Sequence, residues 1–289
     1  MNKGFLNVKK FLANVAASVI FWDKKKRDSL RYKLSPVNAR RCVKYLSRYT
    51  QNVEPEPLME VGSSRYIWMC WLQGVDNAPE IVKTCIQSVI ENKPSDYQLV
   101  VITKDNFADY VALPDFIIEK HEKNIISMPH FSDILRLYLL YRYGGFWIDA
   151  TCLLSSELPE RICNSDFFLY RSFGVFERTF INNCFIHAKA GNRIVGKWIK
   201  AMVDYWRKEK ITMEYFVHHY VFISLLENDA EFRSLFEACE LTQTDENMHL
   251  LYNKAKCRED IDSDYYAMAC EKSFIHKLTY KFEFTFLLD

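Results

Sequence analysis

The stretch FSDILRLYLLYRYGGFWIDATCLL, residues 131–154, contains the order of elements that decides the fold. Its first half is apolar at helical spacing, with Ser132 as the predicted N-cap and Gly144 as the residue that follows the helix. The Gly-Gly pair permits a tight turn and a close approach of the backbone. The apolar run 146–154 then predicts a strand, and it carries the carboxylate of Asp149. We therefore expect a helix that turns sharply into a strand.

Strands and helices alternate on both sides of this stretch. Strands are predicted over 66–72, 97–103, DFFLYRS (166–172), CFIHAKA (184–190) and part of FIHKLTYKFEF (274–284), and helices over 79–92, 132–143, 192–209, 213–227 and 230–239. The apolar centre of 97–103 is typical of a parallel strand that is buried on both faces. The alternation predicts an α/β fold, in which helices flank a mostly parallel sheet of Rossmann type.

Composition excludes several classes of protein. Lys and Arg number 38 against 37 Asp and Glu, so a net charge of +1 gives no reason to expect a nucleic-acid partner. The nine cysteines include no CxxC pair and no Cys/His zinc spacing, which favours reduced thiols in a cytoplasmic protein. No GxxxxGK[ST], GxSxG or HExxH motif is present.

The first 55 residues are basic and are predicted to form a helical extension and linker, followed by a single domain over 56–289. The apolar run 11–22 is shorter than the about 20 residues that a membrane-spanning helix needs. Lysines flank it on both sides, and two interpretations stay open. It is either a helix packed on the protein surface, or an interfacial helix that attaches the protein peripherally to the inner face of the cell membrane.

Three charged residues of the opening stretch have candidate functional roles. Asp133 and Arg136 lie three residues apart and share one face of the predicted helix. An Asp near a helix N-terminus and an Asp–Arg pair also have a purely structural explanation. Asp149 is harder to explain structurally, because aspartate is depleted in strands and a buried carboxylate needs a partner. We expect it at the carboxyl end of the strand, where open α/β sheets bind ligands.

The sequence SDILRLYLLYRYGGFWIDAT (132–151) resembles the central motif of capsular polysaccharide synthesis glycosyltransferases, which are related to glycosyltransferase family 32 and its DXD sugar-binding region. A weaker likeness covers roughly 60–285, most of the chain. The resemblance implies a GT-A-like fold and contacts of Asp133 and Arg136 with the hydroxyl groups of a donor sugar. It places the first Asp of DXD at Asp149 and puts Thr151 where the second Asp would bind a metal.

The resemblance implies further donor-binding residues. Trp71 matches an aromatic residue that stacks on the nucleotide base, and Gln73 and Gly74 follow it at a turn; a core position for Trp71 is the alternative. His276 and Lys277 match a segment that closes over the phosphates, and the alternative is an exposed basic strand. The expected cofactor is a divalent cation, Mn²⁺ or Mg²⁺, held by Asp149 and His276, although Thr151 supplies no carboxylate.

These expectations together predict a hexosyltransferase that uses a nucleotide-diphosphate sugar, expected to be a UDP-sugar, and the family resemblance implies retention of the anomeric configuration. The predicted acceptor is a glycan of capsular or surface polysaccharide synthesis, expected to be lipid-linked. Two alternatives stay open: a non-catalytic, donor-binding scaffold of a polysaccharide assembly complex, and a sugar-phosphate transferase. The released nucleotide distinguishes the sugar-phosphate transferase from the other two possibilities, because that enzyme would release a nucleoside monophosphate.

Overall fold

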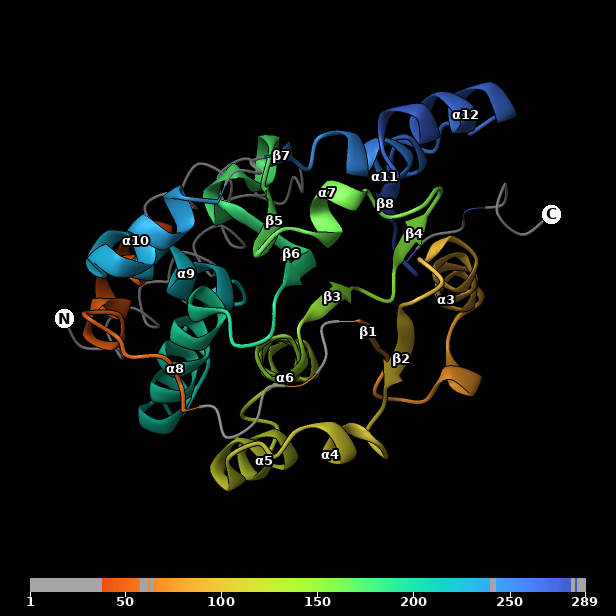
Figure 1. The fold of residues 1–289 in the computed structure, drawn as a ribbon. Helices are drawn as coiled ribbons and strands as arrows, with labels where there is room; N and C mark the ends of the chain where they lie inside the picture. Colours follow the sequence, from red (N-terminus) through yellow and green to blue (C-terminus); the bar gives the residue numbers. More distant parts are fainter. Residues whose placement is uncertain (1–37, 58–61, 63–64, 240–242, 282–283, 285–289) are drawn as a thin grey trace, which may run out of the picture.

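The computed structural model describes residues 38–57, 62, 65–239, 243–281 and 284. Their centre is a six-stranded sheet in the order β2-β1-β3-β6-β5-β7 (Figure 1). Its strands are β1 (Tyr66–Cys70), β2 (Gln98–Ile102), β3 (Gly145–Ile148), β5 (Phe167–Arg171), β6 (Ile181–Ala188) and β7 (Gln243–Thr244). The pairs β1–β2, β1–β3 and β5–β7 are parallel, and β6 is antiparallel to both of its neighbours. The predicted α/β fold with a mostly parallel sheet is confirmed.

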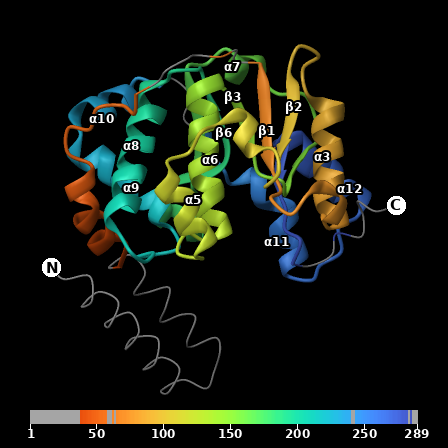
Figure 2. The ribbon, with the colours of Figure 1, turned by 90° about the horizontal axis from the view of Figure 1, so that it is seen from below.

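Helices cover both faces of the sheet, and Figure 2 shows α6 and α8 on one side of β1 and α3 on the other. The helices are α3 (Glu80–Asn92), α4 (Phe107–Tyr110), α5 (Asp115–Glu122), α6 (Met128–Tyr143), α7 (Glu160–Cys163), α8 (Arg193–Lys208), α9 (Val217–Asn228), α10 (Ala230–Glu237), α11 (Leu250–Lys256) and α12 (Ser263–Lys272). A separate antiparallel pair, β4 (Cys152–Leu154) with β8 (Ile275–Lys277), lies beside α3 (Figure 1).

The central strands divide their side chains between two cores, as the alternation of a strand requires. Trp68 and Trp147 join the core beneath α6 and α8. Their neighbours Ile67 and Phe146 face the opposite core, which includes residues of α3 and of the β4–β8 pair. All of these side chains are fully or almost fully buried, so the strands that precede the site rest on packed side chains on both faces.

The structure corrects two predictions about the stretch 131–154. Helix α6 begins at Met128, with Ser127 as N-cap and a proline in its first turn, so Ser132 lies inside the helix and does not cap it. The predicted strand 146–154 is broken after Ile148. A turn at Asp149, in which Cys152 N–H donates to the Asp149 carbonyl at 2.8 Å, sends the chain into β4 and out of the main sheet.

The predicted glycine turn between α6 and β3 is present and tight. Gly144 and Gly145 have φ values of +68° and +88°, a region that favours glycine. A Cβ at Gly145 would lie 2.0 Å from the carbonyl oxygen of Tyr66 on the adjacent strand. Because that contact is impossible for a side chain, β3 can approach β1 directly after the helix only with glycine there.

The described part of the predicted extension packs on the domain. A helix over 38–46 contributes Cys42, Val43 and Leu46 to the core of α6 and α8. Val53 N–H donates to Asp229, whose carboxylate pairs with the buried Lys197 of α8 at 3.0 Å. Buried contacts therefore join this segment to the domain. The apolar run 11–22 lies outside the described residues, and none of the helices that the structure describes has the length and apolar character to cross a bilayer.

Candidate active site

A cavity of about 390 Å³ opens at the carboxyl ends of β1, β3 and β5, beside the first residues of β6. Trp71, Asp149 and Ser172 each follow the last residues of one of these strands and line the cavity. Asp133 and Arg136 of α6 line it as well, and Lys277 reaches it from β8. Carboxyl ends of parallel strands are where open α/β sheets bind ligands, so the structure places these charges at the expected edge.

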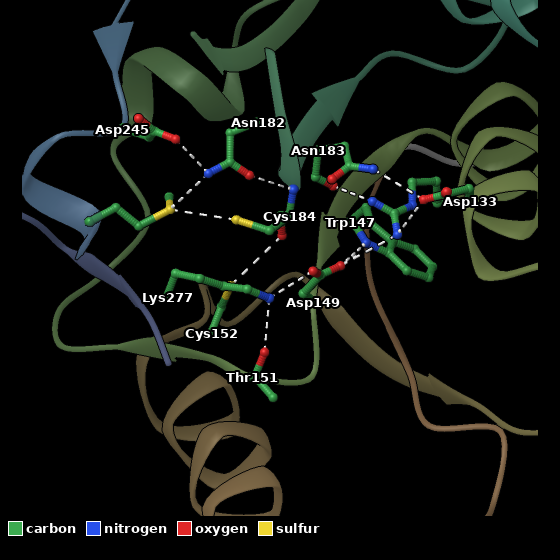
Figure 3. Close-up of polar contacts among 12 residues, drawn as sticks. Asp133, Trp147, Asp149, Thr151, Cys152, Asn182, Asn183, Cys184, Asp245 and Lys277 are labelled. Carbon is green, nitrogen blue, oxygen red and sulfur yellow. Dashed lines mark hydrogen bonds and ion pairs between the residues drawn. The ribbon is translucent and has the colours of Figure 1, made fainter. Parts of the chain in front are cut away.

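Both carboxylate oxygens of Asp149 are engaged by positive or hydrogen-bonding groups (Figure 3). Its Oδ1 accepts a hydrogen bond from Trp147 Nε1 at 2.9 Å and lies 3.6 Å from Arg136 Nη2. Its Oδ2 accepts from Lys277 Nζ at 2.8 Å. The Asp149 and Lys277 side chains remain 25% and 24% exposed, so both can be reached from the cavity.

Arg136 connects the helix to the strands. Its guanidinium group lies 3.0 Å from Asp133 Oδ1, donates to the carbonyl oxygen of Asn183 and lies 4.8 Å from the centre of the Trp147 ring. Asn183 Nδ2 in turn donates to Asp133 Oδ1 at 3.0 Å. The predicted Asp133–Arg136 pair therefore exists, and it bridges to Asp149 on the next element.

The pKa values of these groups follow from their neighbours. Burial alone would raise the pKa of Asp149, but the charges of Lys277 and Arg136 outweigh it and lower the pKa to about 2. Burial opposes the charge on Lys277, yet Asp149 raises the Lys277 pKa above its ordinary value. For Asp133 burial dominates over Arg136 and raises the pKa. Asp149 and Lys277 consequently stay charged at neutral pH.

Of the predicted base- and phosphate-binding residues, Trp71 and Lys277 line the cavity and three others do not. Trp71 packs edge-on against Tyr280, with 5.7 Å between ring centres. Gln73 and Gly74 lie in the turn beyond it, where the Gln73 carbonyl accepts a hydrogen bond from Asn77. His276 is fully buried, and its Nε2 lies 3.1 Å from Ser155 Oγ on the β4 side.

The adjacent histidines of α9 have different surroundings. His218 is fully buried, and its ring lies against Trp198 with 4.2 Å between ring centres. His219 lines the cavity, where burial and the charge of Arg136 lower its pKa to about 3. His219 is therefore neutral at physiological pH and is a poor proton acceptor.

The residues at this edge do not fit the expected divalent cation. Nζ of Lys277 lies 2.8 Å from Asp149 Oδ2, on the first expected ligand, and 2.8 Å from Thr151 Oγ1, at the position of the second Asp of DXD. The second expected ligand, His276, points away from the cavity. Among the described residues, no three His, Cys, Asp or Glu side chains are grouped to hold a metal ion.

Sequence reasoning missed several polar residues of the cavity. Asn182 and Asn183 are the second and third residues of β6, and Asn182 Nδ2 donates to Asp245 at 2.8 Å (Figure 3). Asp245 also accepts from the backbone N–H of Phe173 and is 1% exposed. The only local signal was two consecutive amide side chains ahead of the apolar run CFIHA, which does not by itself predict a site.

Known proteins of similar sequence are glycosyltransferases by name. The chain is 27% identical over 164 residues to the O-glycosyltransferase braB of Annulohypoxylon truncatum, an alignment that covers 50% of this chain and 38% of that protein. It is 24% identical over 159 residues to the glycosyltransferase afumC of Aspergillus fumigatus, covering 50% of this chain and 41% of that protein. The chain thus spans about two fifths of the length of these curated relatives.

Among solved structures, the PaToxG glycosyltransferase aligns with 85% of this chain and 96% of its own, with a TM-score of 0.43 and 18% identity. The family of capsular polysaccharide synthesis proteins matches residues 19–288, which is nearly the whole chain and includes every residue of the cavity. The chain therefore belongs to the capsular polysaccharide synthesis protein family.

Proposed function

We propose that the protein is a glycosyltransferase that moves a hexosyl group from a nucleotide-diphosphate sugar, a UDP-sugar by expectation, to a glycan of capsular or surface polysaccharide synthesis. The observation that carries the proposal is the row of charges Asp133, Arg136, Asp149 and Lys277 along a 390 Å³ cavity at the carboxyl edge of the sheet. The family match and the names of the relatives support the same class of reaction.

The charges suit the two ends of such a donor. Carboxylates accept hydrogen bonds from sugar hydroxyl groups, and Asp133 and Asp149 both face the cavity. A diphosphate gains negative charge as it leaves, and fixed cations placed beside it stabilise the transition state. Among the described residues that line the cavity, the only Lys and Arg side chains are those of Arg136 and Lys277. Trp71 offers an aromatic face for the base at the same edge.

In the proposed reaction, the bond between the anomeric carbon and the diphosphate oxygen breaks, and its electron pair goes to the leaving phosphate. The acceptor hydroxyl oxygen forms the new bond to the anomeric carbon. The pKa of Asp149, about 2, and that of His219, about 3, make both groups poor bases. We therefore assign the acceptor proton to the leaving diphosphate, which is consistent with attack on the face from which it departs and with retention of configuration.

A product assay tests this function. UDP-sugars are incubated with the full chain and an oligosaccharide acceptor, and the released nucleotide is identified. We expect UDP, and we expect Asp149→Asn to lower the rate by about 10²–10³-fold, because Lys277 loses its charged partner, Arg136 loses one of its two, and the sugar loses a charged acceptor. The matched control is Asp166→Asn, which removes a carboxylate that is 78% exposed and paired with Lys189.

Two results would count against the proposal. Release of UMP in place of UDP would identify a sugar-phosphate transferase. Tight UDP-sugar binding with no turnover in the presence of a range of acceptors and water would identify a donor-binding scaffold.

A further inference from the structure

The Asp-Ala-Thr turn after β3 holds a cation that belongs to the protein itself. Lys277 Nζ lies between the side chains of Asp149 and Thr151, at 2.8 Å from an oxygen of each (Figure 3). A divalent ion held by the same two residues would have to occupy the position of this ammonium group. The other oxygen of Asp149 is already bound by Trp147 and faces Arg136.

The backbone holds Lys277 in this position. In the β4–β8 pair, Lys277 lies opposite Cys152, the residue directly after Thr151. Leu278 N–H then donates to the Thr151 carbonyl oxygen at 2.8 Å. The strand register therefore delivers the ammonium group to the Asp-Ala-Thr turn, and the position does not depend on a flexible surface side chain.

The ammonium group retains a donor for a ligand. A lysine ammonium has three N–H donors, and the two contacts at 2.8 Å use two of them. The nearby thiol of Cys184 is no competitor as an anion, because burial raises its pKa well above the ordinary value. The remaining donor can reach an oxygen of a phosphate group in the cavity that Lys277 lines.

We propose that Lys277 takes the place of the divalent cation at this site, binding the diphosphate of the donor with its third N–H, so that donor binding and transfer proceed without a metal. The inference rests on the proposed function, because it assigns a role toward the nucleotide-diphosphate donor. Thr151 contributes to this arrangement, because its hydroxyl group accepts a hydrogen bond from Lys277. A second carboxylate at this position would instead favour a metal ion.

Binding of a nucleoside diphosphate tests the proposal without relying on turnover. UDP, with GDP in parallel, is titrated calorimetrically into the full chain in EDTA and again in MnCl₂. We expect the wild-type dissociation constant to agree within about twofold between the two conditions. Lys277→Met should weaken binding at least about tenfold in both conditions, whereas Lys277→Arg, which keeps the charge, should lose less. Lys272→Met, an exposed lysine of α12, is the matched control.

A second variant tests whether the altered site can bind a divalent metal ion. Thr151→Asp combined with Lys277→Met leaves two carboxylates around an open position. We expect this variant to bind Mn²⁺, seen as a change in the Mn²⁺ paramagnetic resonance signal, and to bind UDP only when Mn²⁺ is present. Circular dichroism and thermal unfolding identify any variant that fails to fold, and the EDTA comparison on the wild-type chain then decides alone.

The outcomes separate the two proposals. Wild-type UDP binding that disappears in EDTA and returns with Mn²⁺ would overturn the role of Lys277 and leave the transferase function standing. Unchanged binding by a folded Lys277→Met variant would do the same. Absence of UDP and GDP binding under every condition would overturn both proposals.

Discussion

Arg136 is shared between two carboxylates, and its environment makes it hard to replace. Its side chain is 6% exposed, and it lies 3.0 Å from Asp133 and 3.6 Å from Asp149. Without it the buried Asp133 would lose its ion-pair partner, and Asp149 would keep only Lys277. Removing one partner of a buried ion pair costs about 3–5 kcal/mol, because the other charge is left uncompensated.

A double-mutant cycle measures this dependence. We expect Arg136→Met to lower the free energy of unfolding by about 3 kcal/mol. The same change in an Asp133→Asn background should cost at least about 1 kcal/mol less, because one of the stranded charges is gone. Urea unfolding of the four proteins gives the coupling energy. Additive losses would show that Asp133 and Arg136 do not stabilise each other.

At the level of single residues, the sequence predicted the positions of Asp133, Arg136 and Asp149, because one helix, one glycine turn and one strand lie together in the chain. It associated Lys277 with the phosphates only through the family resemblance. The contact between Lys277 and Asp149 joins residues 128 positions apart, and no local pattern encodes it. The resemblance also predicts a phosphate-binding role for the adjacent His276, but strand alternation sends its side chain to the other side of β8.

Among the elements, the turn from α6 into β3 positions the site, because Asp149 follows β3 directly. The turn depends on Gly145, where a side chain would meet the backbone of Tyr66. Gly174 is a useful comparison. It also has a positive φ, +63°, but nothing lies within 4 Å of the place where its Cβ would be.

Alanine substitutions at the two glycines distinguish the energetic cost of steric crowding from that of backbone strain. We expect Gly145→Ala to lower the free energy of unfolding by about 3 kcal/mol or more, since strain and overpacking add. Gly174→Ala should cost about 1 kcal/mol, from strain alone. Urea unfolding of both variants measures the difference. Equal losses would mean that β1 moves away from β3 at little cost.

Element boundaries were less predictable than element types. The sequence predicts a start of α6 at Ser132, because a serine before an apolar run resembles a cap, but Ser127 and Pro129 provide an earlier start. The run 146–154 reads as one strand because apolar residues continue through it. The break at Asp149 arises from pairing of β4 with β8, which is a tertiary contact.

On the scale of the whole molecule, four histidines are held neutral by their surroundings. Burial lowers the pKa of His187 to about 4, of His276 to about 4 and of His219 to about 3, and that of His218 also falls well below its ordinary value. Below pH 6.5 the unfolded chain binds protons that the folded chain excludes. Stability is therefore complete above that pH and falls as the pH drops toward the folded-state values.

Each such histidine is expected to lower the free energy of unfolding by about 1.4 kcal/mol when the pH falls from 7.5 to 5.5. Comparison of the wild-type chain with His187→Asn isolates one of them, because contributions from all other groups cancel. His187 is 1% exposed, and its Nδ1 lies 3.1 Å from Ser165 Oγ, a contact that asparagine can imitate. Urea unfolding at both pH values should show that the free energy of unfolding falls by about 1.4 kcal/mol less in the variant than in the wild-type chain. The same loss in both proteins would mean that His187 is protonated in the folded state.

The position of Lys277 in the chain has a consequence for biosynthesis. Every strand of the main sheet lies before residue 245, whereas β8, which carries the lysine, is translated later. A growing polypeptide thus contains Asp133, Arg136 and Asp149 before it contains Lys277, the second cation that faces Asp149. A polypeptide that stops ahead of β8 would keep every strand of the main sheet but would lack Lys277 and the core residue Ile275, so both the ion pairing of Asp149 and the packing beside α3 would be incomplete.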